Sequence, residues 1–185
     1  MSKSSERMRN EAAALRFIAA RTTIPVPKVI SFKRVWGAYQ LVMERIRGVS
    51  LDCIKGVERE LAVRNAEMYI TSTVLPQLKS LESSTMGALI GGIILPNRNI
   101  SYSSDQGPSS VGSESEQLFT FCHNDLAQHN IMMDPDSLQV VAIIDWEGSG
   151  FYNADFELPL WTVAWHEPGH DELIETKIVC KCLQK

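Results

Sequence analysis

Hydrophobic positions recur with helical spacing in the first part of the chain. Residues 4–21 carry an apolar stripe made of Met8, Leu15, Ile18 and Ala19. The spacing predicts a helix, with Glu11 near the edge of the stripe. We expect this helix to end before Pro25, because residues that precede a proline are pushed out of the helical region.

A second helical pattern covers residues 58–81. Its apolar positions are Val63, Ala66, Ile70, Val74, Leu78 and Leu81. The pattern predicts a long core helix. We expect Pro76 to kink it, because proline removes a backbone hydrogen bond.

Short runs rich in Val, Ile, Phe and Leu predict strands. Residues 28–34 and 39–44 predict a hairpin that turns at Trp36-Gly37-Ala38. The Ser- and Gly-rich residues 97–116 predict a flexible surface loop. Further strands are expected at residues 119–122, 131–133 and 140–144, and helices at residues 155–166 and 171–183.

Composition is that of one soluble domain, which we expect to span residues 1–185. Hydrophobic residues make up 44% and charged residues 22% of the chain. The formal net charge of -4 gives no reason to expect a nucleic-acid partner. We expect no membrane segment and a cytoplasmic location, because the N-terminus lacks an export signal and the four cysteines form no disulfide framework.

The chemistry-bearing stretch is His123-Asn-Asp-Leu-Ala-Gln-His-Asn130, followed by Ile143-Ile-Asp145. The first part has the H-x-D-x-x-x-x-N spacing of a kinase catalytic loop, and Asp145 follows an apolar strand as a metal-binding Asp does. The run Asp134-Pro-Asp-Ser137 predicts a turn between two strands. We expect Asn130 and Asp145 to be equidistant from this turn, at the open end of one hairpin, where their oxygens suit Mg²⁺.

Asp125 lies on the loop before that hairpin and could accept the proton of a substrate hydroxyl. His123 is expected to support the loop through hydrogen bonds. The alternative is that these residues match the motif spacing by chance and have only structural roles. A zinc site formed by His123, His129 and Cys180-x-Cys182 is a further alternative, which the unusual ligand spacing disfavours.

Several segments resemble the aminoglycoside phosphotransferase and choline kinase-like family, especially its fungal members. They are the run Asn10-Glu-Ala-Ala-Ala-Leu-Arg-Phe-Ile-Ala-Ala20, the run Ile24-Pro-Val-Pro-Lys-Val29, the run Leu41-Val-Met-Glu-Arg-Ile-Arg-Gly48, and the catalytic segment. Together the matches span residues 11–161. The resemblance implies an α+β, protein-kinase-like fold, with a partial N-terminal lobe of helix plus hairpin (1–45) and a mainly helical C-terminal lobe with a catalytic β-hairpin (46–185).

The resemblance also implies an ATP-dependent phosphotransferase that acts on a hydroxyl of a small molecule. Asp125 would be the catalytic base, and Asn130 and Asp145 would bind Mg²⁺. Glu44 and Ile46 would bound a hinge whose backbone meets the adenine edge of the nucleotide, although this segment could also be an ordinary strand end.

Glu11 resembles the helix glutamate that pairs with a phosphate-binding lysine, or else is a solvated helix carboxylate. That lysine and a glycine-rich loop are expected before the helix, yet only ten residues precede Glu11, and no G-x-G-x-x-G pattern occurs. The alternative function is therefore a truncated, inactive remnant that binds nucleotide weakly or serves as an interaction module. A protein kinase is disfavoured, because little room separates Asp145 from the next predicted helix for an activation loop.

Overall fold

The computed structural model describes residues 3–92, 94 and 118–163, and begins with helix α1 (Lys3–Arg21), as predicted. Leu15 and Ile18 are buried. Ala19, expected on the same stripe, is exposed, because the buried face turns instead toward Asn10, Glu11 and the small residues after them. A helix face that buries polar residues points to a specific contact with the rest of the chain.

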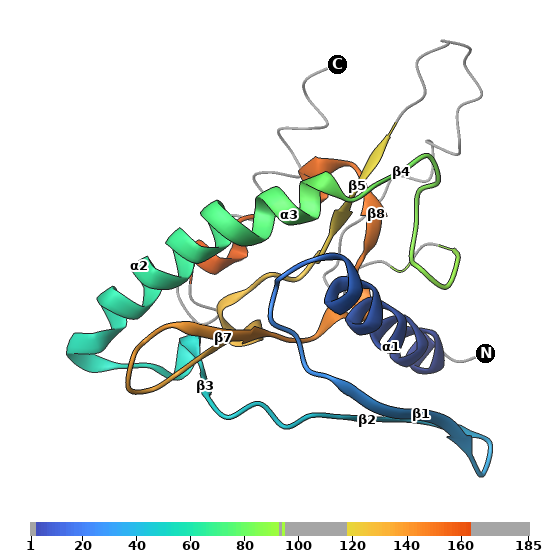
Figure 1. Cartoon of the computed structure of the whole chain (residues 1–185), viewed down its shortest axis with the longest axis horizontal. Helices are drawn as coiled ribbons and strands as arrows, with labels where there is room; N and C mark the ends of the chain where they lie inside the picture. The colour runs from blue at the N-terminus through green and yellow to red at the C-terminus, as the bar shows by residue number, and fades with distance from the viewer. Residues whose placement is uncertain (1–2, 93, 95–117, 164–185) are drawn as a thin grey trace.

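Strands β1 (Val29–Val35) and β2 (Ala38–Met43) form the predicted antiparallel hairpin. Its turn residues Trp36 and Gly37 have φ values of 53° and 86°, as in the tight turns that match strand twist. All residues of β1 and β2 are described, and none of them is fully buried. The hairpin therefore stands apart as a two-stranded sheet that extends beside α1 (Figure 1).

The predicted long helix forms, in three consecutive pieces: α2 (Arg59–Tyr69), the π-helical η3 (Ile70–Val74) and α3 (Leu75–Ser80). The π segment lies immediately before the turn that contains Pro76. A π turn is a known way for a helix to adjust its backbone hydrogen bonds locally. The structure thus shows a change of helical period next to Pro76, and the kink expected there stays a prediction.

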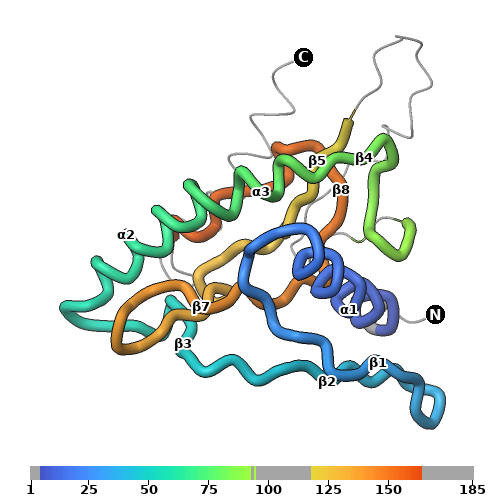
Figure 2. The backbone as a smooth tube through the Cα atoms, viewed as in Figure 1, coloured from blue at the N-terminus to red at the C-terminus, as the bar shows by residue number. Residues whose placement is uncertain are grey.

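Two small antiparallel sheets lie beside the long helix (Figure 2). Strand β6 (Ile131–Met133) pairs with both β3 (Val49–Ser50) and β7 (Val140–Ile143). The other sheet has the order β4 (Glu82–Ser83), β5 (Phe119–Cys122) and β8 (Gly150–Tyr152). Helix α3 contacts β5 and α2 contacts β7, so the long helix covers both sheets.

The turn between β6 and β7 is organised by Asp134. Its Oδ1 accepts hydrogen bonds from the backbone N–H groups of Asp136 and Ser137 and from the Ser137 hydroxyl. The bonds from Ser137 in particular hold the pKa of Asp134 below its ordinary value. The predicted turn is confirmed.

The register of this hairpin differs from the expected equal spacing. A bulge between Met132 and Met133 shifts the pairing, so that the backbone N–H of Ile144 donates to the Asn130 carbonyl at 3.0 Å. Asn130 therefore lies opposite Ile144, and Asp145 follows one residue beyond the last paired position. The bulge was not visible in the sequence, because no glycine marks it.

The predicted helix at 155–166 is wrong over its described part, residues 155–163. Two short 3-10 turns occupy it, η6 (Ala154–Phe156) and η7 (Leu160–Thr162). Pro159 explains the break, since it lacks an N–H and restricts the residue before it. The described part of the chain after residue 45 is consequently less helical than predicted.

The predicted loop 97–116 and helix 171–183 lie outside the described residues. Within the described ranges, no helix combines the length and the apolar character that crossing a membrane requires.

Candidate active site

A cavity of about 650 Å³ lies between α1, the end of β2 and the open end of the β6–β7 hairpin. Five of the six predicted site residues line it: Glu11, Glu44, Ile46, Asn130 and Asp145. Apolar side chains, including Leu41, Met43 and Met132, supply much of the remaining wall. The fold thus gathers residues from three separate segments around one space.

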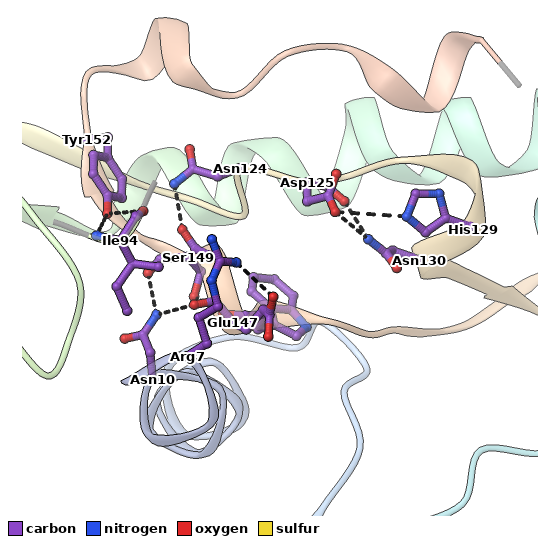
Figure 3. Close-up of polar contacts among 12 residues, drawn as sticks. Arg7, Asn10, Ile94, Asn124, Asp125, His129, Asn130, Glu147, Ser149 and Tyr152 are labelled. Atoms are coloured by element: carbon purple, nitrogen blue, oxygen red, sulfur yellow. Dashed lines mark hydrogen bonds and ion pairs between the residues drawn. The ribbon is translucent and has the colours of Figure 1, made fainter. Parts of the chain in front are cut away.

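The sixth predicted residue, Asp125, is hydrogen-bonded to Asn130. The Asn130 Nδ2 donates to the Asp125 carbonyl at 2.8 Å and to its Oδ2 at 3.3 Å (Figure 3). Both bonds use the amide nitrogen, which leaves the amide oxygen as the available ligand atom in the cavity wall. His129 Nε2 lies 3.9 Å from the same Asp125 Oδ2.

His123 connects the Asp125 loop to the end of β7. Its Nδ1 accepts the backbone N–H of Asp125 at 3.2 Å, and its Nε2 lies 3.0 Å from the Ile144 carbonyl. Because Nδ1 is an acceptor here, Nε2 carries the proton and donates to Ile144. The ring is fully buried and packs on Trp146 with a centroid separation of 4.4 Å. The supporting role predicted for His123 fits these contacts.

Glu157 supports the same loop from the other side, and the sequence reasoning missed it. Its Oε2 accepts the backbone N–H groups of His123 and, at 3.4 Å, of Asn124. Burial, with the Glu157 charge adding to it, raises the pKa of Cys122 to about 12, so this thiol stays protonated. Only the three-dimensional fold brings Glu157 here, because it lies in the segment that was mistaken for a helix.

Asp145 has a left-handed backbone conformation, with φ 64° and ψ 57°. The residue remains exposed to the cavity, yet its pKa is raised to about 6: desolvation of the carboxyl contributes most, the charges of Glu147 and Asp125 add to it, and Arg7 opposes it. A carboxylate held among other carboxylates is well suited to bind a cation.

Glu11 is buried, with 7% of its surface exposed, so it is not a solvated helix carboxylate. Its pKa is raised to about 8: desolvation contributes most, the charges of Asp145 and Glu147 add to it, and a hydrogen bond from the Trp146 backbone opposes it. Among the described residues, no group forms a hydrogen bond with Glu11 Oε2. The predicted pairing of Glu11 with a lysine therefore stays a prediction.

The predicted hinge lies at the end of β2. The Glu44 backbone N–H donates to the Lys28 carbonyl at 2.8 Å, and Glu44 Oε2 accepts the Lys28 N–H at 3.3 Å. Within the described residues, these bonds use neither the Glu44 carbonyl nor the Ile46 N–H. Both residues line the cavity, where a ligand would meet these backbone groups.

The donor set at Asn130 and Asp145 fits a hard cation. Both residues line the same cavity, and their side chains carry the oxygen atoms that Mg²⁺ prefers as ligands. In residues 3–92, 94 and 118–163, no group of three or more His, Cys, Asp and Glu is arranged to hold a metal alone. A magnesium ion here would depend on phosphate oxygens to complete its shell, and no zinc cluster is found in that part of the chain.

The family model described as "Phosphotransferase enzyme family" (APH) matches residues 106–179 of the chain. The predicted resemblance to this family is confirmed over that segment. Among curated proteins, no sequence matches the chain.

Solved structures match over most of the chain. Aminoglycoside phosphotransferase APH(3'')-Id from Streptomyces rimosus ATCC10970, in complex with ADP and streptomycin, has 18% identity and a TM-score of 0.58; the match covers 96% of this chain and 76% of that one. An aminoglycoside-3'-phosphotransferase of type VIII has 18% identity and a TM-score of 0.54, covering 98% and 75%. The GDP complex of wild-type aminoglycoside 2'-phosphotransferase-IIIa has 14% identity and a TM-score of 0.52, covering 95% and 71%. These likenesses establish the shared α+β fold.

Proposed function

We propose that this chain is a nucleotide-dependent phosphotransferase that acts on a hydroxyl group of a small molecule. One observation carries the proposal. The residues that sequence reasoning assigned to nucleotide and metal binding line a single cavity, and Asn130 in its wall is hydrogen-bonded to Asp125. The match of residues 106–179 to the phosphotransferase family model supports the same reaction class.

The nucleotide, ATP in our proposal, would lie with its base against the apolar wall. The Glu44 carbonyl would accept a hydrogen bond from the base, and the Ile46 N–H would donate one. The structural relatives with ADP or GDP bound support a purine nucleotide as the donor. Leu41 and Met43 would provide the apolar surface for the ring.

Asn130 and Asp145 would hold Mg²⁺ together with the phosphates. When bound, Mg²⁺ neutralises phosphate charge and orients the group to be transferred. The chain's own part is to keep the two oxygen ligands in place. Asn130 is held by its bonds to Asp125, and the Asp145 backbone by its position after β7.

Asp125 would act as the general base. Its carboxylate would orient the acceptor hydroxyl and take its proton as the hydroxyl oxygen forms a bond to the γ-phosphorus. The bond between that phosphorus and the β-phosphate oxygen breaks, and the nucleoside diphosphate leaves with the electron pair. Asn130 and His123 hold the base in position through the hydrogen bonds described above.

The test is ATP-dependent phosphorylation of an aminoglycoside, a choline-like amine and a sugar by the full chain. Asp125→Asn keeps the shape of the side chain and removes its basicity, so we expect a loss of about 100- to 10,000-fold in rate. Asp136→Asn makes the same change at an exposed turn residue and should leave the rate unaltered. Equal rates for wild type and Asp125→Asn would refute the assignment of the base.

A weakly nucleotide-binding remnant is the second candidate, and one observation favours it. No described residue supplies a cationic partner for the buried Glu11, which the family resemblance pairs with a phosphate-binding lysine. This candidate predicts magnesium-dependent ATP binding with no phosphorylation of any of the three acceptors. Turnover that Asp125→Asn abolishes would exclude it.

A further inference from the structure

Asn10 on α1 is fully buried and uses its amide group to join three segments of the chain. Its Nδ2 donates to the Glu147 carbonyl at 3.0 Å and to the Ser149 carbonyl at 2.8 Å. Its Oδ1 accepts the backbone N–H of Leu89 at 3.2 Å. Figure 3 shows Asn10 pointing from the helix toward the segment that follows Asp145.

The segment that Asn10 contacts is short and has little regular structure. The 3-10 turn η5 (Trp146–Gly148) starts directly after the left-handed Asp145, and Ser149 closes the turn through bonds to the Trp146 carbonyl. The carbonyl groups of Glu147 and Ser149 are the ones that α1 satisfies. Without that donor, these carbonyls would have to turn toward water, because buried carbonyls are rarely left unpaired.

Arg7 strengthens the same contact one helical turn earlier. Its Nη1 lies 2.8 Å from Glu147 Oε1 (Figure 3). Positions three apart share one helix face, so Arg7 and Asn10 approach the segment together. Arg7 is partly exposed and pairs here with a side chain, whereas Asn10 is buried and bonds to the backbone. Asn10 therefore constrains the backbone of the segment more than Arg7 does.

We propose that Asn10 is a positioning residue that holds the Asp145–Ser149 segment so that the Asp145 carboxylate faces the cavity. Its amide is suited to this task, because it offers two donors and one acceptor in a compact planar group. Aspartate has the same shape but no donor for the two carbonyls. The inference rests on the proposed function in so far as Asp145 is taken as a metal ligand.

The test compares the affinity of the full chain for ADP with and without Mg²⁺ by calorimetry. Residues that support metal ligands typically change metal affinity about 10- to 100-fold when removed, so Asn10→Ala should reduce the magnesium-dependent gain by about this factor. Affinity for ADP without the metal should stay within about twofold, since Asn10 does not line the cavity. Asn10→Ser, which keeps one donor, should lie between Asn10→Ala and wild type, and is the variant to use if Asn10→Ala does not fold.

The matched control is Ile18→Val on the same helix. Ile18 is fully buried, so this change weakens the packing of α1 while the hydrogen bonds of Asn10 to Glu147 and Ser149 remain. It should lower the melting temperature and leave the magnesium-dependent gain in ADP affinity intact. An unchanged gain in Asn10→Ala, or an equal loss in Ile18→Val, would overturn the proposal.

Hydrogen exchange separates this inference from the proposed function, because it needs no ligand. In Asn10→Ala, the amides of residues 146–150 should exchange about 10-fold faster or more, while those of β6 and β7 stay as in wild type. If wild type shows no magnesium-dependent gain, the proposed function fails, and the exchange rates alone decide whether Asn10 holds the segment. Unchanged exchange in residues 146–150 would then overturn the inference.

Discussion

Glu11→Gln should remove a pH dependence from the stability of the fold. The pKa of Glu11 is raised from its ordinary 4.5 to about 8, chiefly by desolvation. Because the folded-state pKa is the higher one, the stabilising contribution is complete below about pH 4.5 and is lost as the pH rises through about 8. The full shift corresponds to at most about 5 kcal/mol, and water in the adjacent cavity reduces this to about 2–4 kcal/mol.

Chemical and thermal unfolding at about pH 5 and about pH 8.5 measure this effect. From about pH 5 to about pH 8.5, the free energy of unfolding of Glu11→Gln should rise relative to that of wild type by about 2–4 kcal/mol. For a chain of this size, this corresponds to roughly 5–15 °C in melting temperature. Glu6→Gln, the same change at an exposed position of α1, should show no such trend. A Glu11→Gln advantage that is constant with pH, or that shrinks as the pH rises, would refute the reasoning.

Two further predictions concern the frame around the site. Gly150→Ala should destabilise the fold by about 1–3 kcal/mol or more, because an added Cβ would lie 2.5 Å from the Gly87 carbonyl oxygen. Gly148→Ala is the control and should cost much less, since its added Cβ meets nothing closer than 4.0 Å. Urea unfolding compares the two variants. Glu157→Gln should cost about 1–2 kcal/mol in the same assay, because a neutral amide oxygen replaces the carboxylate that accepts the His123 and Asn124 N–H groups; stability equal to that of wild type would contradict this role.

Elements with strong local signals could be predicted from the sequence. The hairpin at Trp36 and Gly37 and the helix through Ile70 and Leu78 formed as their patterns indicated. The helix predicted from residue 155 onward did not form in its described part, where Pro159 breaks the apolar pattern. There the hydrophobic residues were real core positions, but their spacing was misread as helical.

The site could be predicted as a set of residue types but not as an arrangement. The motif spacing identified Asp125, Asn130 and Asp145, and the last two share a cavity wall. The β-bulge that shifts their register carries no sequence signal of its own, and the supporting contacts of Asn10 and Glu157 span 139 and 34 residues. Such long-range contacts leave no periodic trace in a single sequence.

The most direct test of the account is calorimetry of the full chain with ATP, with and without Mg²⁺, for wild type, Asp145→Ala and the exposed control Asp136→Ala. We expect wild type and the control to bind ATP more tightly when Mg²⁺ is present, and Asp145→Ala to lose that gain, because the ion would lose its charged protein ligand. ATP binding that is indifferent to both Mg²⁺ and Asp145, or no ATP binding by wild type at all, would contradict the proposal that this cleft is a magnesium–nucleotide site.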